Sequence, residues 1–322
     1  MLLKITHTTN LTYSDAISES VMELRMTPRQ EQDQRRLSFN LAIGPATSPS
    51  GYFDWLGNTV NAFTINDFHD RIKIVATSVV ETERRQGDPR ELPDTWPVKL
   101  GPHDYQLYDF LQFGGPVDHA PGIEKLVEQL YPFDGIKLGE LGMRMMTLIN
   151  NKFTYRPGVT TAASPIHDTL DHGWGVCQDF THLMIGIARS MKIPARYVSG
   201  LLHPQAERFR GYTQTHAWVE LYFPSQGWIG FDPTNVCGIG ENYVTVAFGR
   251  DYRDVPPNKG IYRGNATESI EAVVHSELLE SVPPELATDR MHQLNVPTFP
   301  GRHTPYRDQV VHQYESQQQQ QQ

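Results

Sequence analysis

An apolar stripe with helical spacing dominates the middle of the sequence, between residues 177 and 193. Its members recur three and four residues apart and are Phe180, Leu183, Met184, Ile187, Ala188 and Met191. This pattern predicts a helix with one buried face, ended by Pro194. Gly173 and Gly175 allow a sharp turn before the helix. Cys177, one of only two cysteines in 322 residues, therefore stands at the N-terminus of a buried helix.

Three strand-like segments follow this helix, at residues 195–202, 216–223 and 228–231, with a turn at 224–227. If the turn is a three-residue loop, Asp232 faces Trp218 across a hairpin and shares a face with His216. A loop one residue longer or shorter would put these two side chains on opposite faces of the sheet. The register of the hairpin therefore decides whether His216 and Asp232 can meet, and the sequence leaves it open.

Cys177 has two interpretations, a small apolar residue that fills space or a nucleophile. The positive end of the helix dipole favours a thiolate at this position. With the three-residue loop, His216 would accept and return the proton of Cys177, while Asp232 would orient the imidazole and stabilise its charged form. The alternatives are a strand histidine with one satisfied hydrogen bond for His216 and an Asp-Pro that starts a turn for Asp232, so Cys177, His216 and Asp232 are candidate catalytic residues at this point.

Smaller roles are predicted for residues around the thiol. The backbone N–H of Cys177 is a candidate oxyanion donor, and a side chain from Gln214 or Tyr212 is a candidate second donor. Ordinary loop packing is the alternative for both side chains. Trp174 is expected in the core or on the wall of the cleft, and the helix dipole alone favours Asp179 in the first turn.

These motifs resemble the transglutaminase-like superfamily, and specifically its bacterial branch. The resemblance rests on GVCQDFTHLMIGIARSMKIPARYVSG, THAWVELYFPSQGWIGFDPTN, FGRDYRDVPPNKG and, near the N-terminus, LRMTPR and WLGNTVNAFTI. It implies a papain-like arrangement in which a cysteine helix packs on an antiparallel sheet, and it carries the catalytic roles onto Cys177, His216 and Asp232. His172 and Trp174 depart from the plainer polar run expected just before the cysteine.

The resemblance leaves the reaction open. The superfamily includes protein-crosslinking transglutaminases, cysteine peptidases and deglycosylating amidases, and many bacterial members are described as cysteine proteases. All pass through a thioacyl enzyme, and they differ in whether water or an amine completes the turnover. We expect hydrolysis of an amide in a peptide or protein, with transfer of a glutamine acyl group to an amine as the alternative. A non-catalytic interaction module of the same fold is a further alternative, but the presence of all three residue types favours an enzyme.

The chain as a whole predicts an α+β protein of two domains. Period-two alternation in residues 1–82 predicts an antiparallel β-sandwich. Prolines interrupt residues 83–137, which we expect to form an irregular connector with short helices. A helix begins the catalytic core, which spans 138–265, and a final strand lies within 266–281. The polar tail at 282–322 ends in a glutamine run and is expected to be disordered.

Charge and composition exclude several classes of partner. A net charge of −9 argues against nucleic acid or an anionic membrane surface as the main partner. No run of 18 apolar residues is present to span a bilayer, and the first ten residues lack a secretory pattern. Two cysteines cannot form a disulfide framework, which fits a reducing cytoplasm. We therefore expect a cytoplasmic protein, and we predict neither a cofactor nor a calcium-binding loop.

Two alternatives concern the cysteines and histidines. A zinc site would have to draw on Cys177, Cys237, His172, His182 and His216. Their spacing is poor for zinc and no C-x-x-C pair exists, so no metal is predicted. Cys237 could instead form a reversible disulfide with Cys177, and a plain buried cysteine is the competing interpretation. The sequence predicts neither the oligomeric state nor the purpose of the β-rich domain.

Overall fold

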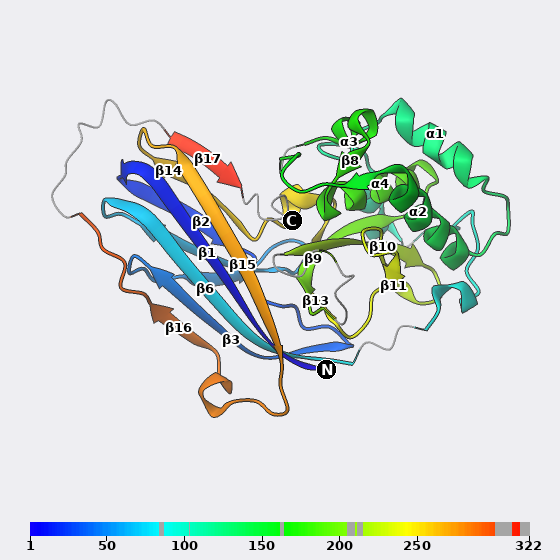
Figure 1. Cartoon of the computed structure of the whole chain (residues 1–322). Coiled ribbons are helices and arrows are strands. Elements are labelled where there is room, and N and C mark those ends of the chain that lie inside the picture. The colour runs from blue at the N-terminus through cyan, green and yellow to red at the C-terminus, as the bar shows by residue number, and fades with distance from the viewer. Residues whose placement is uncertain are drawn as a thin grey trace.

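The computed structural model describes residues 1–83, 87–102, 104–161, 164–204, 210 and 215–299, and only the backbone at 311–315. Two halves lie side by side in it, a β-sandwich and a half in which helices cover a sheet (Figure 1). The α+β class and the antiparallel N-terminal sandwich predicted from the sequence are confirmed. Within the described residues, no helix combines the length and apolar character needed to cross a bilayer.

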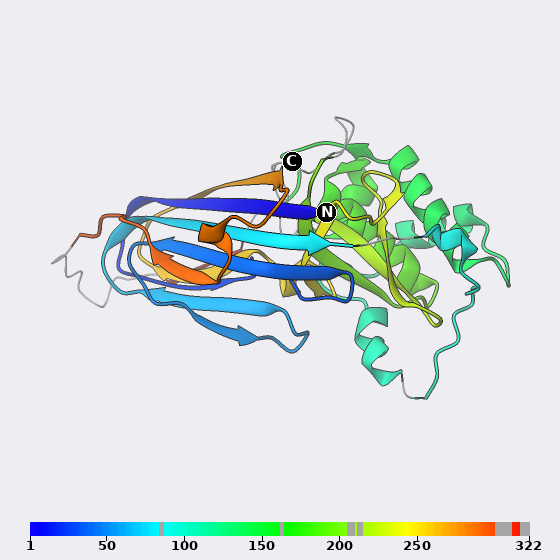
Figure 2. The same cartoon turned by 90° about the horizontal axis from the view of Figure 1, so that it is seen from below.

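The sandwich consists of two five-stranded sheets around one apolar core, and it is seen from below in Figure 2. The first sheet has the order β15 (Glu268–Leu278), β1 (Leu2–Ile17), β6 (His69–Thr82), β3 (Gln34–Gly44) and β16 (Arg290–Gln293). The second has the order β17 (Val311–Glu315), β14 (Asn258–Arg263), β2 (Glu19–Leu24), β5 (Thr59–Ile65) and β4 (Ser50–Phe53). Alternate side chains along most of β1 are buried, which is the period-two pattern of a strand with one face on a core.

The sandwich draws strands from both ends of the chain. The sequence analysis placed residues 258–265 in the catalytic core and treated 266–281 as a separate final strand. In the structure β14 pairs with β2 and β15 pairs with β1, both antiparallel, so these segments complete the two sheets of the sandwich. The catalytic boundary at 265 therefore needs correction. Alternation shows which face of a strand is buried, but it does not show which strand lies beside it.

The prediction of a disordered tail at 282–322 also needs correction for its described parts, residues 282–299 and 311–315. A single 3₁₀ turn, η4 (Pro284–Leu286), leads into β16, which pairs in parallel with β3. Asp289 accepts a hydrogen bond from the backbone N–H of Phe39 at 2.7 Å, just before β16 begins. Further on, β17 pairs with β14. Open sheet edges gain stability from a partner, which a polar segment can supply through its backbone. The glutamine run at 317–322 lies outside the described residues.

The other half is built on a five-stranded antiparallel sheet. Its order is β12 (Cys237–Gly238), β11 (Gly227–Asp232), β10 (His216–Phe223), β9 (Ala195–Leu202) and β13 (Tyr243–Gly249). Its helices are α1 (Pro121–Leu130), α2 (Leu138–Lys152), α3 (Ile166–His172) and α4 (Cys177–Ser190). The cysteine helix α4 contacts β9 and β10, and α2 contacts β11 (Figure 1). This is the predicted arrangement of a cysteine helix on an antiparallel sheet.

The segment between the two halves contributes to the helical core. It contains the 3₁₀ helices η1 (Pro89–Glu91) and η2 (Tyr105–Leu111), followed by α1. Helix α1 contacts both α2 and α4, and it buries Ile123, Leu126 and Leu130 in the same apolar cluster as α4. A buried arginine of α4, Arg189, donates to the carbonyl oxygens of Phe110 and Gln112. The connector is thus packed onto the catalytic half.

Two amide side chains of the sandwich bind the backbone of β13, the strand at one edge of the catalytic sheet. The Gln34 side chain accepts from Thr245 N–H at 2.7 Å and donates to Thr245 O at 2.8 Å. The Asn58 side chain accepts from Phe248 N–H at 3.0 Å and donates to Phe248 O at 2.9 Å. Each amide therefore pairs with a strand residue as a neighbouring peptide group would, and together they close this edge.

Candidate active site

Asp179 caps the helix that begins at Cys177. Its Oδ2 atom accepts hydrogen bonds from Val176 N–H and from the hydroxyl of Thr160, each at 2.8 Å. The side chain is buried, and burial raises its pKa to about 6 although both hydrogen bonds act in the opposite direction. Asp179 thus holds the first turn of α4 in place, which is a more specific role than the dipole interaction expected from the sequence.

The turn before Cys177 requires glycine at two positions. Gly173 ends α3 with a φ of 75°, in the left-handed region that side chains with a Cβ seldom adopt. A Cβ atom on Gly175 would stand 2.7 Å from the Cβ of Asp179, closer than two carbons can approach. The short strand β8 (Trp174–Gly175) runs through this turn and pairs in parallel with β7 (Thr154–Tyr155).

The hairpin of β10 and β11 has the register on which the site depends. Phe223 pairs with Gly227, so the loop has three residues, as the favourable alternative from the sequence required. The Nε2 atom of His216 lies 2.7 Å from Oδ2 of Asp232, and both side chains are fully buried. The structure therefore brings together the histidine and the aspartate that the sequence singled out.

Asp232 is held as a carboxylate by a set of hydrogen-bond donors. Oδ1 accepts from the backbone N–H groups of Thr234 at 2.8 Å and Asn235 at 3.2 Å. Oδ2 accepts from the Asn235 side chain and the Tyr243 hydroxyl, each at 2.8 Å, in addition to His216. Burial raises the pKa of Asp232, but the charge of His216 and these side-chain hydrogen bonds outweigh burial and lower it.

His216 links this carboxylate to the thiol. Burial alone would lower the pKa of His216, but the charge and hydrogen bond of Asp232, together with the hydrogen bond and charge of Cys177, raise it to about 10. Nε2 is engaged by Asp232, and Nδ1 makes no other hydrogen bond to a described residue. The arrangement leaves Nδ1 for the thiol of Cys177, which is itself fully buried.

The remaining predicted residues fall in different places. Trp174 is half-buried and stacks on His172, with ring centroids 4.7 Å apart. The two residues that looked unusual before the cysteine therefore form one aromatic pair beside it. Tyr212 and Gln214, the candidate oxyanion donors, lie outside the described residues.

The structure adds three residues that sequence reasoning missed. Asn235 and Tyr243 hold Asp232, and Tyr155 packs at the start of α4. Asn235 follows Asp232 by three residues, and this Asx spacing is a local signal that could have found it. Tyr243 lies on another strand and Tyr155 lies before the helix, so no spacing in the sequence connects either of them to the thiol.

The rival sites involving cysteine and histidine are not assembled among the described residues. No group of three or more His, Cys, Asp or Glu side chains there is arranged to hold a metal ion. The buried His182 accepts a hydrogen bond from the backbone N–H of Tyr252 at 3.2 Å. Both cysteines are free thiols, and Sγ of Cys237 lies 3.3 Å from the hydroxyl of Tyr243.

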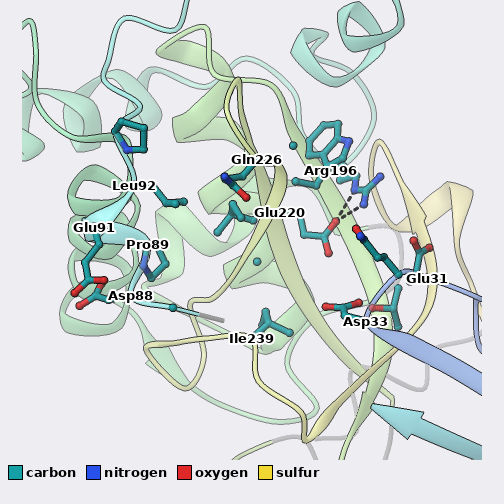
Figure 3. Close-up of a pocket in the computed structure, with 18 residues that line it drawn as sticks. Glu31, Asp33, Asp88, Pro89, Glu91, Leu92, Arg196, Glu220, Gln226 and Ile239 are labelled. Atoms are coloured by element: carbon teal, nitrogen blue, oxygen red, sulfur yellow. Dashed lines mark hydrogen bonds and ion pairs between the residues drawn. The ribbon is translucent and has the colours of Figure 1, made fainter. Parts of the chain in front are cut away.

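A cavity of about 800 Å³ lies elsewhere, between the sandwich, the connector and the catalytic sheet (Figure 3). Acidic side chains from all three parts line it, namely Glu31, Asp33, Asp88, Glu91 and Glu220. Several of these carboxylates are already neutralised by ion pairs, as Glu220 is by Arg196 and Asp88 by Arg90. Among the described residues that line the cavity, none belongs to the predicted triad. The cavity is therefore distinct from the thiol site.

Known proteins resemble both halves of the chain. A profile of the transglutaminase-like superfamily matches residues 137–233, and one of the bacterial transglutaminase-like N-terminal region matches 3–81. An uncharacterized protein of Mycobacterium leprae is 33% identical over 288 residues, or 84% of this chain and 97% of its own. A protein-glutamine gamma-glutamyltransferase of Pseudomonas aeruginosa is 32% identical over 87 residues, or 26% of this chain and 13% of its own.

A solved structure shares the fold of nearly the whole chain. The crystal structure of a candidate cysteine protease from Cytophaga hutchinsonii matches with a TM-score of 0.69 at 23% identity. The match covers 88% of this chain and 93% of that one. It therefore includes the sandwich as well as the half that carries Cys177, His216 and Asp232.

Proposed function

The chain belongs to the transglutaminase-like superfamily, and from that premise we propose that it is a thiol enzyme that forms a thioacyl intermediate at Cys177 on amide bonds of peptides or proteins. One observation carries the proposal. Nε2 of His216 is hydrogen-bonded to the buried carboxylate of Asp232, and the imidazole also interacts with the thiol of Cys177. A nucleophile, a base and an orienting group in that order are the requirements of acyl transfer.

The first half of the proposed reaction uses these groups in turn. Nδ1 of His216 takes the proton of the Cys177 thiol, and the sulfur attacks the carbonyl carbon of the amide. A carbon–sulfur bond forms while the carbonyl electrons move to oxygen. When the carbonyl re-forms, the carbon–nitrogen bond breaks and His216 returns the proton to the leaving nitrogen. Asp232 keeps the imidazole oriented and stabilises its positive charge throughout.

In the second half, water or an amine attacks the thioester. His216 takes a proton from the attacking group and returns it to the sulfur as the carbon–sulfur bond breaks. We favour water as the acceptor because water needs no binding site of its own, whereas an amine does. Transfer to an amine is the second candidate, since the Pseudomonas aeruginosa relative carries the name of a protein-glutamine gamma-glutamyltransferase.

The free thiols support a proposal for the compartment, and the net charge bears on the class of partner. Both cysteines are free, which suits a reducing compartment, and we propose the cytoplasm. The net charge of −9 disfavours nucleic acid, and the proposed chemistry on amide bonds makes a peptide or protein the proposed partner.

The reaction is tested by incubating the protein with dimethylated casein, whose own lysines are blocked, with and without hydroxylamine. New amino termini would indicate peptide hydrolysis, ammonia without new termini would indicate glutamine deamidation, and hydroxamates would indicate transfer to an amine. The Cys177→Ala variant is the control and should produce none of these. Equal, background signals from the wild type and Cys177→Ala would contradict acyl transfer to this thiol from such substrates.

A second test separates an enzyme from a non-catalytic module. We expect iodoacetamide to alkylate Cys177 readily near pH 6 in a Cys237→Ser background, because an imidazolium beside the sulfur favours the thiolate. Adding His216→Ala should slow the reaction strongly at that pH. Intact mass gives both rates. If Cys177 reacts like an ordinary thiol and ignores the loss of His216, the fold serves as an interaction module.

A further inference from the structure

Tyr155 is held against the start of the catalytic helix at two points. Backbone pairing of β7 with β8 puts Tyr155 beside Gly175, two residues before Cys177, and Arg156 N–H donates to Gly175 O at 2.9 Å. Its ring packs edge to face on Phe180, in the first turn of α4, with centroids 6.1 Å apart. The phenol is therefore fixed with respect to the helix that carries the thiol.

The hydroxyl of Tyr155 is buried, yet it has no hydrogen-bond partner among the described residues. Buried polar groups in folded proteins are almost always paired, so an unpaired one requires an explanation. The comparable hydroxyl of Tyr243 shows the usual situation, because it donates to Asp232. A donor left open beside the start of the cysteine helix is explained if its partner arrives with the substrate.

The charges and the burial around Tyr155 keep its hydroxyl protonated, so that it remains a donor. Burial raises the pKa of Tyr155, the charge of Cys177 raises it further, and Arg210 acts in the opposite direction. The Arg210 guanidinium lies 5.1 Å from the centre of the ring. A phenol with a raised pKa keeps its proton over the whole range in which the enzyme would work.

We propose that the hydroxyl of Tyr155 donates a hydrogen bond to the oxyanion formed when Cys177 attacks an amide. This inference rests on the proposed thioacyl chemistry and assigns a further catalytic residue to it. As the carbon–sulfur bond forms, the carbonyl electrons move to oxygen, and the phenolic O–H stabilises the negative charge. When the carbon–nitrogen bond breaks, the electrons return to the carbonyl and His216 supplies the proton of the leaving group. Tyr155 keeps its own proton throughout.

The position of Tyr155 complements the helix. The N-terminus of α4 already carries partial positive charge from its backbone dipole, so a negative oxygen is favoured there. A side-chain donor fixed on β7 would add to this field from a second element. Because the charge on the oxygen is larger in the transition state than in the bound amide, the hydroxyl acts chiefly on kcat.

The test compares Tyr155→Phe with the wild type and with Tyr262→Phe. Tyr262 lies in the sandwich, where its hydroxyl donates to Ala266 O, so the control removes the same atom far from the thiol. The probes are acetamidoacetaldehyde, which forms a reversible thiohemiacetal with a cysteine, and iodoacetamide, which is attacked at a saturated carbon and forms no oxyanion. Hydrolysis or hydroxamate formation on dimethylated casein gives kcat and KM.

For Tyr155→Phe we expect kcat to fall by roughly 10²–10³-fold with KM little changed, the usual loss for one oxyanion donor. We also expect clearly weaker binding of acetamidoacetaldehyde and an unchanged rate of alkylation by iodoacetamide. Tyr262→Phe should match the wild type in every measurement.

The other outcomes separate the two proposals. A wild type that alkylates like an ordinary thiol and turns nothing over contradicts the proposed function itself. If the wild type alkylates rapidly but Tyr155→Phe binds the aldehyde equally well, the oxyanion role is wrong and the proposed function stands. If Tyr155→Phe also slows iodoacetamide, Tyr155 acts on the thiol or on its surroundings, and the oxyanion assignment is again wrong. The aldehyde decides the question even before a substrate is known.

Discussion

Nε2 of His216 lies 2.7 Å from Oδ2 of Asp232, with both side chains completely buried. A buried ion pair is tolerated only when further hydrogen bonds satisfy its remaining polar atoms. Here Thr234, Asn235 and Tyr243 supply them to the carboxylate. The pair thus fixes the ring so that Nε2 faces the carboxylate and Nδ1 is available to the thiol.

Replacing Asp232 with Asn should change how His216 titrates. Without the carboxylate, burial dominates, and we expect the pKa of His216 to fall from about 10 to below its ordinary value of 6.5. Because the folded-state pKa is raised, His216 stabilises the wild type fully below pH 6.5, and this contribution is lost as pH rises through about 10. NMR titration of the imidazole measures the change.

The same variant should lose roughly 10³–10⁴-fold in kcat, as expected when a histidine loses its orienting carboxylate. The control is His182, a second buried histidine, whose pKa of about 4 is set mainly by burial and should not move. A His216 pKa that stays near 10 in Asp232→Asn would show that another group carries the effect assigned to the carboxylate.

Replacing Tyr243 with Phe should weaken the site without removing any member of the triad. The change deletes one donor to Asp232, and we expect activity to fall roughly 10-fold, as for other groups that orient a catalytic residue. Cys237→Ser is the matched control, because Cys237 contacts the Tyr243 hydroxyl but is not among the donors to Asp232. Equal rates of turnover for Tyr243→Phe and the wild type would contradict this role.

Local periodicity predicted the elements that carry the site. The strands at 195–202 and 216–223 have the predicted bounds, and the helix begins at Cys177, because apolar spacing directly reflects which faces are buried. The loop length then determined the face of Asp232. These features depend on neighbours within about 16 residues, which is the separation that sequence patterns describe well.

Contacts between distant segments could not be read in the same way. Tyr243 reaches Asp232 from β13, which is joined to the hairpin through β9, so its position depends on the order of strands. The pairing of β14 with β2 likewise joins segments more than 200 residues apart. A single sequence gives the buried face of each strand, but strand order is decided by the packing of the whole chain.

Replacing Gln34 with Ala should destabilise the junction between the two halves. The change removes the oxygen that accepts from Thr245 N–H and one donor to Thr245 O, which still accepts from Arg29 N–H at 3.1 Å, and the space is closed to solvent. A buried group that loses its partner costs about 1–3 kcal/mol, so we expect the free energy of unfolding to fall by about 1–3 kcal/mol. Urea unfolding followed by tryptophan fluorescence measures it.

The control for this change is Gln32→Ala, two residues away and exposed, which should alter stability by less than about 0.5 kcal/mol. Since β13 also carries Tyr243, activity of Gln34→Ala should decline at a lower temperature than in the wild type. Indistinguishable unfolding curves for the two glutamine variants would mean that the amide contributes nothing to this edge.

Replacing Asp179 with Asn should remove a dependence of stability on pH. Burial raises the folded-state pKa of Asp179 from 3.8 to about 6, so the wild type should lose about 2 kcal/mol of unfolding free energy as pH rises from 4 to 7. In Asp179→Asn the side chain retains an oxygen for Val176 N–H but does not ionise. In Asp179→Ala the capping hydrogen bond is lost as well, which should lower the free energy of unfolding by about 1 kcal/mol at every pH. Urea titrations at several pH values give the comparison. Parallel pH profiles for the wild type and Asp179→Asn would show that Asp179 does not titrate in this range.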